Sequence, residues 1–98
     1  MTTIFGNGTA TSIDGPVSIA TIINPQGISI HPITQEVYIA EYGGKNIRGW
    51  NRTSQTVRTV VNLGLYSPEY SDFINDGTLF ITTDYGLYKL FTNGSIKI

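Results

Sequence analysis

The stretch Asn24-Pro-Gln-Gly-Ile-Ser-Ile-His-Pro32, followed by Glu36-Val-Tyr-Ile-Ala-Glu41 and then Asn46-Ile-Arg48, carries the main structural signal of this sequence. Its β-branched and aromatic residues form short runs bounded by Gly, Pro and Asn, which is typical of consecutive short strands. The run at residues 37–40 and the similar run at residues 79–82 are too apolar to leave one face in water, so we expect two strands that are buried on both faces.

The second half of the chain repeats this pattern. Pro25 corresponds to Pro68, 43 residues later. A period of about 40 to 50 residues with four strands in each repeat is typical of a β-propeller blade. We therefore predict an all-β fold of two propeller blades, each made of four antiparallel strands. The remaining correspondences pair residues 37–40 with 79–82, 47–50 with 87–90, and 56–58 with 95–97.

The predicted boundaries follow from the turn residues between the runs. We expect one two-blade unit over residues 1–98, with the first blade at about 25–61, the second at about 68–98, and a loop at 6–24 that leads into the first blade. A separate short strand is expected at residues 2–5. The eight strands of the blades are predicted at residues 27–30, 36–41, 46–50, 56–61, 70–74, 78–83, 87–91 and 95–98.

The composition supports this fold class and excludes several functions. Ile, Val and Thr occupy 32 of the 98 positions, and 40% of the residues are hydrophobic, so we expect a β-rich, soluble globular chain. A net charge of -1 argues against binding to nucleic acid or to an anionic membrane. No apolar run approaches the roughly 18 residues of a membrane span. The absence of Cys excludes disulfides and thiolate metal sites.

The opening stretch quoted above resembles an NHL repeat, and Phe5-Gly-Asn-Gly-Thr9 with Asp14-Gly-Pro16 resembles the loop that commonly enters such a blade. The match covers most of residues 1–61. The second copy departs from the pattern, with Tyr70 where the first copy has Gly27 and a shorter turn at 84–86. The resemblance implies an NHL-repeat β-propeller, typically of six blades. The resemblance further implies that Glu41 bonds to the following turn and has no catalytic role.

Two blades alone leave two sheet faces open, and about three or more repeats are usually needed for a stable stack. The sequence therefore predicts a homo-oligomer in which chains join head to tail in a closed ring. Three chains would supply six blades. Rings of four or five chains, a fragment of a longer propeller, and an engineered or duplication-intermediate chain remain alternatives.

The two ends of the chain indicate where the ring would be joined. Read one after the other, residues 94–98 and 2–5 resemble the outer strand at 55–61, with Thr3-Ile-Phe5 matching Thr59-Val-Val61. Residues 2–5 of a neighbouring chain would then complete the second blade and cover an exposed strand edge. The residues of this assembly seam are predicted to be Thr3, Ile4, Phe5, Ile96 and Ile98.

Few residues could carry chemistry. His31 is the only histidine, and its simplest interpretation is a turn residue that bonds to the backbone. Asp72 could face a central channel, where symmetric copies would form an acidic ring, but a carboxylate in water or bonded to a turn is the simpler interpretation. His31 and Asp72 are thus weak metal candidates, and a single histidine gives no support to a Ser-His-Asp triad.

These observations predict a structural or interaction module whose partner is itself, with no catalytic residues and no cofactor. A metal or small-ligand site in the channel, by analogy with NHL propellers that act as lyases or hydrolases, is the alternative. A rim that binds a protein or glycan is also compatible with the tyrosines expected near turns, which are Tyr42, Tyr66 and Tyr85. The cellular compartment stays open.

Overall fold

A computed structural model describes residues 3–6, 8 and 11–97. Within these residues the chain forms β-strands and no helix, so the predicted all-β class is confirmed and no helix there could cross a membrane. The strands are β1 (Gly15–Pro16), β2 (Pro25–Ile30), β3 (Val37–Glu41), β4 (Asn46–Asn51), β5 (Thr56–Asn62), β6 (Pro68–Phe73), β7 (Leu79–Thr83), β8 (Leu87–Leu90) and β9 (Ile96–Lys97).

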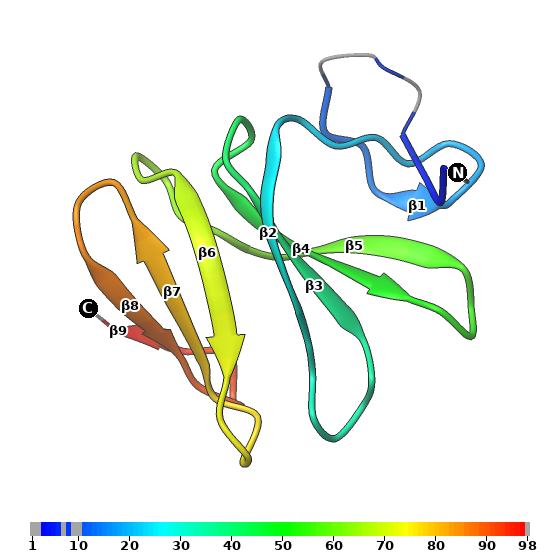
Figure 1. The fold of residues 1–98 in the computed structure, drawn as a ribbon. Coiled ribbons are helices and arrows are strands. Elements are labelled where there is room, and N and C mark those ends of the chain that lie inside the picture. Colours follow the sequence, from blue (N-terminus) through cyan, green and yellow to red (C-terminus); the bar gives the residue numbers. More distant parts are fainter. Residues whose placement is uncertain (1–2, 7, 9–10, 98) are drawn as a thin grey trace.

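The strands form two antiparallel sheets that lie side by side (Figure 1). The first sheet has the order β1-β5-β4-β3-β2, and the second has the order β6-β7-β8-β9. Each of the eight predicted strands of the two repeats is present, although β2 and β6 begin two residues earlier than expected, at Pro25 and Pro68. These prolines are tolerated because β2 and β6 are the edge strands of their sheets.

The internal repeat of the sequence is reproduced in the strand registers. Both sheets have a register shift at the same point, between Pro25 and Gly27 in the first and between Pro68 and Tyr70 in the second. The two copies therefore share the same pairing in their first three strands despite their different side chains, and the two residues of β9 pair like their counterparts in β5. In the corresponding antiparallel pairs, Ile39 lies opposite Arg48 as Ile81 lies opposite Tyr88, and Trp50 lies opposite Val57 as Leu90 lies opposite Ile96.

The loop expected at residues 6–24 contains a short strand and an isolated bridge between Ile13 and Thr21. Gly15 and Pro16 form β1, which pairs with Val57 and Thr56 on the outer edge of the first sheet. A strand of two residues has no alternating pattern, so the sequence showed only its turn residues. Residues 3–5 form no strand within the single chain, whereas Thr2 and Ile98 lie outside the described residues.

The core lies between the two sheets. Because side chains alternate along a strand, one face of each sheet points inward. The expected double burial of residues 37–40 is confirmed, since all five residues of β3 are buried. The same expectation for residues 79–82 is wrong, because β7 is buried mainly on the face that meets the first sheet and Thr82, on its other face, is exposed. The buried core residues are Tyr38, Ala40, Ile47, Leu63, Leu79, Ile81, Tyr88 and Leu90.

The edge strands β2 and β6, one from each sheet, approach each other closely. The Ser29 and Ser71 hydroxyls hydrogen-bond across the gap at 3.1 Å. A Cβ added at Gly27 would lie 2.9 Å from the backbone oxygen of Glu69 and 3.1 Å from the Cα of Tyr70. Glycine is therefore required at position 27 because a larger residue would push the two strands apart.

This close approach predicts the effect of Gly27→Ala. The methyl group meets backbone atoms that cannot rotate away, so we expect the free energy of unfolding to fall by about 1 to 3 kcal/mol. Urea denaturation measures the change. The control is Gly86→Ala, where a Cβ would have no neighbour within 4 Å. Equal stability of the two variants would contradict the assigned role of Gly27.

Candidate functional site

The largest fully buried side chain in the described residues belongs to Arg48, on β4. Its Nη1 donates to Glu41 Oε2 at 2.8 Å, and its Nη2 forms an ion pair with Asp14 Oδ1 at 2.8 Å. The same two nitrogens donate to Ser12 Oγ and to the backbone oxygens of Ile13 and Thr21. A buried charge needs this many partners because its removal from water is costly.

Glu41 ends β3 and is fully buried. Its carboxylate accepts hydrogen bonds from the Asn46 side chain at 2.8 Å and from the backbone nitrogen of Ile23 at 2.9 Å. The expected bond between Glu41 and the following turn is therefore confirmed, because Asn46 directly follows that turn. Ser12 also donates to Glu41, at 3.0 Å. The carboxylate is fully engaged in structural bonds.

Together these bonds fix the N-terminal segment, residues 11–23, on the face of the first sheet that points away from the second. Asp14 strengthens the attachment because it also accepts from the backbone nitrogen and the hydroxyl of Thr59 on β5, at 3.1 and 3.0 Å. The sequence did not indicate this network, since its members come from residues about thirty positions apart and Arg48 has no distinguishing motif. The network holds the N-terminal segment against the first sheet, and we call it the clamp; its central residues are Arg48, Glu41, Asp14 and Ser12.

The second sheet attaches its connecting segment differently. By the strand registers, Tyr88 takes the place of Arg48. Its ring packs against Tyr66, in the segment between β5 and β6, with centroids 5.5 Å apart, and Tyr66 packs against Tyr85 at 5.6 Å. Of the tyrosines expected near turns, Tyr66 and Tyr85 are thus brought into one aromatic cluster. The repeat preserves the connection while exchanging an ionic clamp for an aromatic one.

The two metal candidates, His31 and Asp72, each bond to the backbone of a neighbouring residue in the chain. His31 follows β2, and its Nδ1 accepts hydrogen bonds from the backbone nitrogens of Ile33 and Thr34, both at 3.2 Å. The interpretation of His31 as a turn histidine is therefore confirmed. Asp72 is exposed, and its Oδ1 accepts from the backbone nitrogen of Phe73 at 3.0 Å. No group of three His, Cys, Asp or Glu that could hold a metal occurs within the described residues.

A further ion pair, which the sequence did not reveal, lies beside His31. Arg58 on β5 donates to both carboxylate oxygens of Glu36, at 2.7 and 3.0 Å, and to the Tyr38 hydroxyl at 3.2 Å. The pair spans β4 above Gly49, where a Cβ would lie 3.1 Å from Glu36. The hydrogen bond to Glu36 holds the pKa of Arg58 above its ordinary value, and burial raises the pKa of Tyr38. Both groups therefore keep their protons at neutral pH.

Arg58, Tyr38 and His31 form one wall of a cleft of about 190 Å³ between the two sheets. Phe73 and Phe91 line its other side. The rings of His31 and Tyr38 contact the ring of Phe73, with centroids 4.9 and 5.0 Å apart.

The outward faces of both sheets carry several of the large exposed hydrophobic residues. On the first sheet Ile28 is 69% exposed, and on the second sheet Tyr70 is 61% and Leu87 55% exposed. Of the predicted seam residues, Ile4 is 52% exposed and Ile96 is also exposed on β9, whereas Thr3 and Phe5 lie beside Ile4 in the chain. These side chains are not buried within a single chain. Because together they expose apolar surface, the outward faces of the two sheets are the candidate interaction site.

No protein-family model matches the chain, and a search of curated proteins finds no match either.

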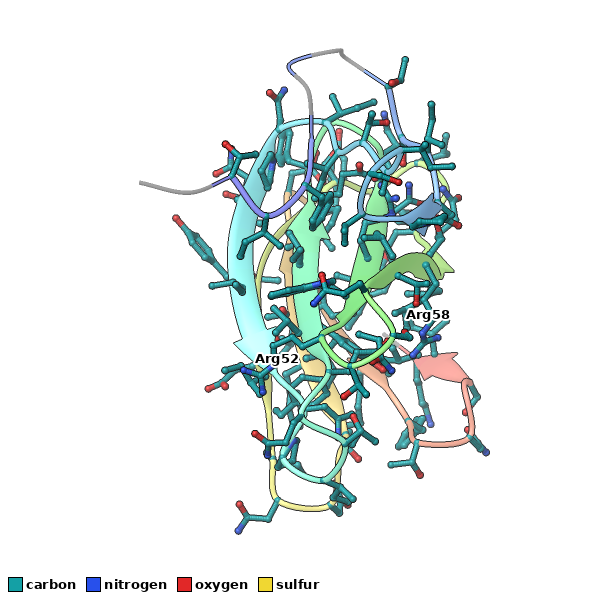
Figure 2. All side chains as sticks on the ribbon, turned by 90° about the vertical axis from the view of Figure 1, so that its right-hand side faces the viewer. Arg52 and Arg58 are labelled. Carbon is teal, nitrogen blue, oxygen red and sulfur yellow. The ribbon has the colours of Figure 1, made fainter. Side chains whose placement is uncertain are left out.

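The clamp predicts that Arg48→Met will be strongly destabilising. Methionine removes the charge that neutralises Glu41, and loss of one partner from a buried pair costs about 3 to 5 kcal/mol. Thermal and urea unfolding measure the loss. Arg52→Met is the matched control because Arg52 is exposed on the turn between β4 and β5, apart from Arg58 (Figure 2). An Arg48→Met protein as stable as the control would show that the clamp contributes nothing.

Proposed function

We propose that this chain is a structural self-assembly module, a two-blade NHL-like unit without catalytic activity that packs head to tail with copies of itself. Three chains would form a closed, six-bladed β-propeller. The proposal rests on one observation. In the internal repeat, the outward face of the second sheet corresponds to the buried face of the first sheet, and the outward face of the first sheet corresponds to the buried face of the second.

The strand registers give this relation residue by residue. On the outward face of the second sheet, Phe80 and Leu87 correspond to Tyr38 and Ile47, which are buried in the core. On the outward face of the first sheet, Ile30 corresponds to Phe73, which packs against that core. Within one chain, one rotation and translation relates the first sheet to the second. The same movement applied to the second sheet would place the first sheet of a neighbouring chain against its outward face.

The hydrophobic effect supports this arrangement. Each large apolar side chain stabilises an assembly by about 1.5 to 3 kcal/mol when it becomes fully buried. A heterologous contact of this kind closes into a ring when its rotation permits. Within one chain, Tyr38 and His31 surround Phe73. The corresponding contact between chains would place Ile30 of one chain against Phe80 and Ile74 of the next.

The mass in solution tests the ring directly. One chain has a mass of 10.7 kDa, so we expect a particle of three times that mass by light scattering or native mass spectrometry. A mass of four or five chains would retain the ring and change its blade number. A monomer at micromolar concentration would refute the proposal.

A pair of isoleucines separates the assembly face from ordinary exposed surface. Ile30 lies on the outward face of the first sheet and is 52% exposed, whereas Ile33, which is 67% exposed, lies in the turn between β2 and β3. Ile30→Lys is expected to dissociate the ring because it would place a charge against Phe80 and Ile74 of the neighbouring chain. Ile33→Lys is expected to leave the mass unchanged. Equal masses for the two variants would show that the outward face of the first sheet is not an interface.

A further inference from the structure

The cleft between the two sheets combines hydrogen-bond donors with an apolar lining. It lies where β2 and β6 end, because His31 follows β2 and Phe73 ends β6. Its volume of about 190 Å³ is below the roughly 300 to 1,000 Å³ of pockets for drug-sized ligands, so only a small molecule fits. Its apolar lining comes from Val60, Leu79 and Leu90. All lining residues belong to one chain, so the cleft does not depend on the proposed ring.

The imidazole of His31 presents one donor to this cleft. Its Nδ1 accepts hydrogen bonds from the backbone nitrogens of Ile33 and Thr34. A ring nitrogen that accepts carries no proton, so the proton of the neutral imidazole is on Nε2. A Cβ at Gly77 would lie 3.1 Å from Nε2, and Gly77 also lines the cleft. Because Nε2 has no hydrogen-bond partner among the described residues, its proton is available to a ligand.

The guanidinium of Arg58 presents a second donor. Its Nε and Nη2 donate to Glu36, and Nη2 also donates to the Tyr38 hydroxyl. These bonds fix the plane of the guanidinium and leave the two N–H groups of Nη1 without an acceptor in the part of the chain that the structure describes. The side chain of Arg58 is 55% exposed, so a ligand can reach it from solvent.

The second sheet does not repeat this combination of groups. By the strand registers, Phe80 takes the place of the buried Tyr38, and Ile74 follows β6 where His31 follows β2. Only a cation is retained, as Lys97. Since both sheets keep the same pairing in their first three strands, that pairing does not require the hydroxyl or the imidazole. Their convergence with a guanidinium is a feature of this cleft and not of the repeat.

We propose that the cleft binds a small monocarboxylate that carries an aromatic ring. The carboxylate accepts from Nη1 of Arg58 and from Nε2 of His31, and such charge-assisted hydrogen bonds are about twice as strong as neutral ones. The aromatic ring of the ligand contacts Phe73 and Phe91, where it gains apolar burial. Glu36 already neutralises part of the charge of Arg58, which favours a ligand with one negative charge over one with several.

Titration with sodium benzoate, followed by NMR, tests the site. The backbone amide signals of Gly77 and Gly94, which line the cleft, are expected to shift saturably with a Kd of about 1 mM, a typical value for so small a ligand. The signal of Gly86, in the turn at the other end of β7, is expected to stay in place. Benzyl alcohol has a similar ring without the charge and is expected to bind about tenfold more weakly. Equal binding of the alcohol, or no saturable shift with benzoate, would overturn the proposal.

A double variant removes the charged contact without leaving an unpaired charge. Arg58→Gln alone would leave Glu36 without its partner, so it is combined with Glu36→Gln, which keeps two neutral side chains that can hydrogen-bond. The melting temperature checks that the double variant is folded, and its affinity for benzoate is expected to fall by about tenfold or more. Arg52→Gln is the control because Arg52 is exposed on the turn between β4 and β5. Unchanged affinity in the double variant would contradict the role of Arg58.

Glu36→Gln alone separates charge from shape. It removes a negative charge beside the carboxylate of the ligand and retains Arg58, so benzoate is expected to bind more tightly and benzyl alcohol as before. Weaker benzoate binding would overturn the ionic contact. The site and the ring can also fail separately: a monomer that binds benzoate keeps the site and refutes the ring, whereas a trimer that binds none keeps the ring and refutes the site.

Discussion

A four-stranded antiparallel sheet with apolar residues on both faces must be covered twice, and this constraint governs the whole structure. The first sheet meets it within the chain, since the second sheet covers one face and the N-terminal segment covers part of the other. As a result β3 is buried along its full length. The second sheet has only one cover, so Tyr70 and Leu87 remain exposed. The requirement for a second cover is the physical basis of the assembly that we propose.

The two copies of the repeat solve the same local problem with different chemistry. Arg48 binds its connecting segment through charged hydrogen bonds, whereas Tyr88 binds the corresponding segment through aromatic packing. A buried ion pair is not necessarily more stabilising than a well-packed apolar contact, but its geometry is more specific. The ionic clamp lies where a long segment must be held in one position, and the tyrosine lies where the connection is short.

For the assembly that we propose, the shared strand pairing matters more than the identity of the side chains. Gly27 and Tyr70 differ greatly in size, yet the register shifts at the same point in both sheets. Because the registers agree, one geometric step relates the buried contact to the exposed faces. A module can therefore tolerate an imperfect sequence repeat provided that its strands keep the same pairing.

The sequence by itself determined the strands, the repeat and the turn role of His31, because alternating residues, prolines and turn residues are local signals. It also predicted the double burial of β3 from a continuous apolar run. Only the tertiary structure revealed β1, the clamp around Arg48 and the ion pair of Arg58 with Glu36. These features include contacts between residues 22 to 45 positions apart. No local pattern marks such contacts, since they depend on which strands become neighbours and on the space that Gly49 leaves between two of them.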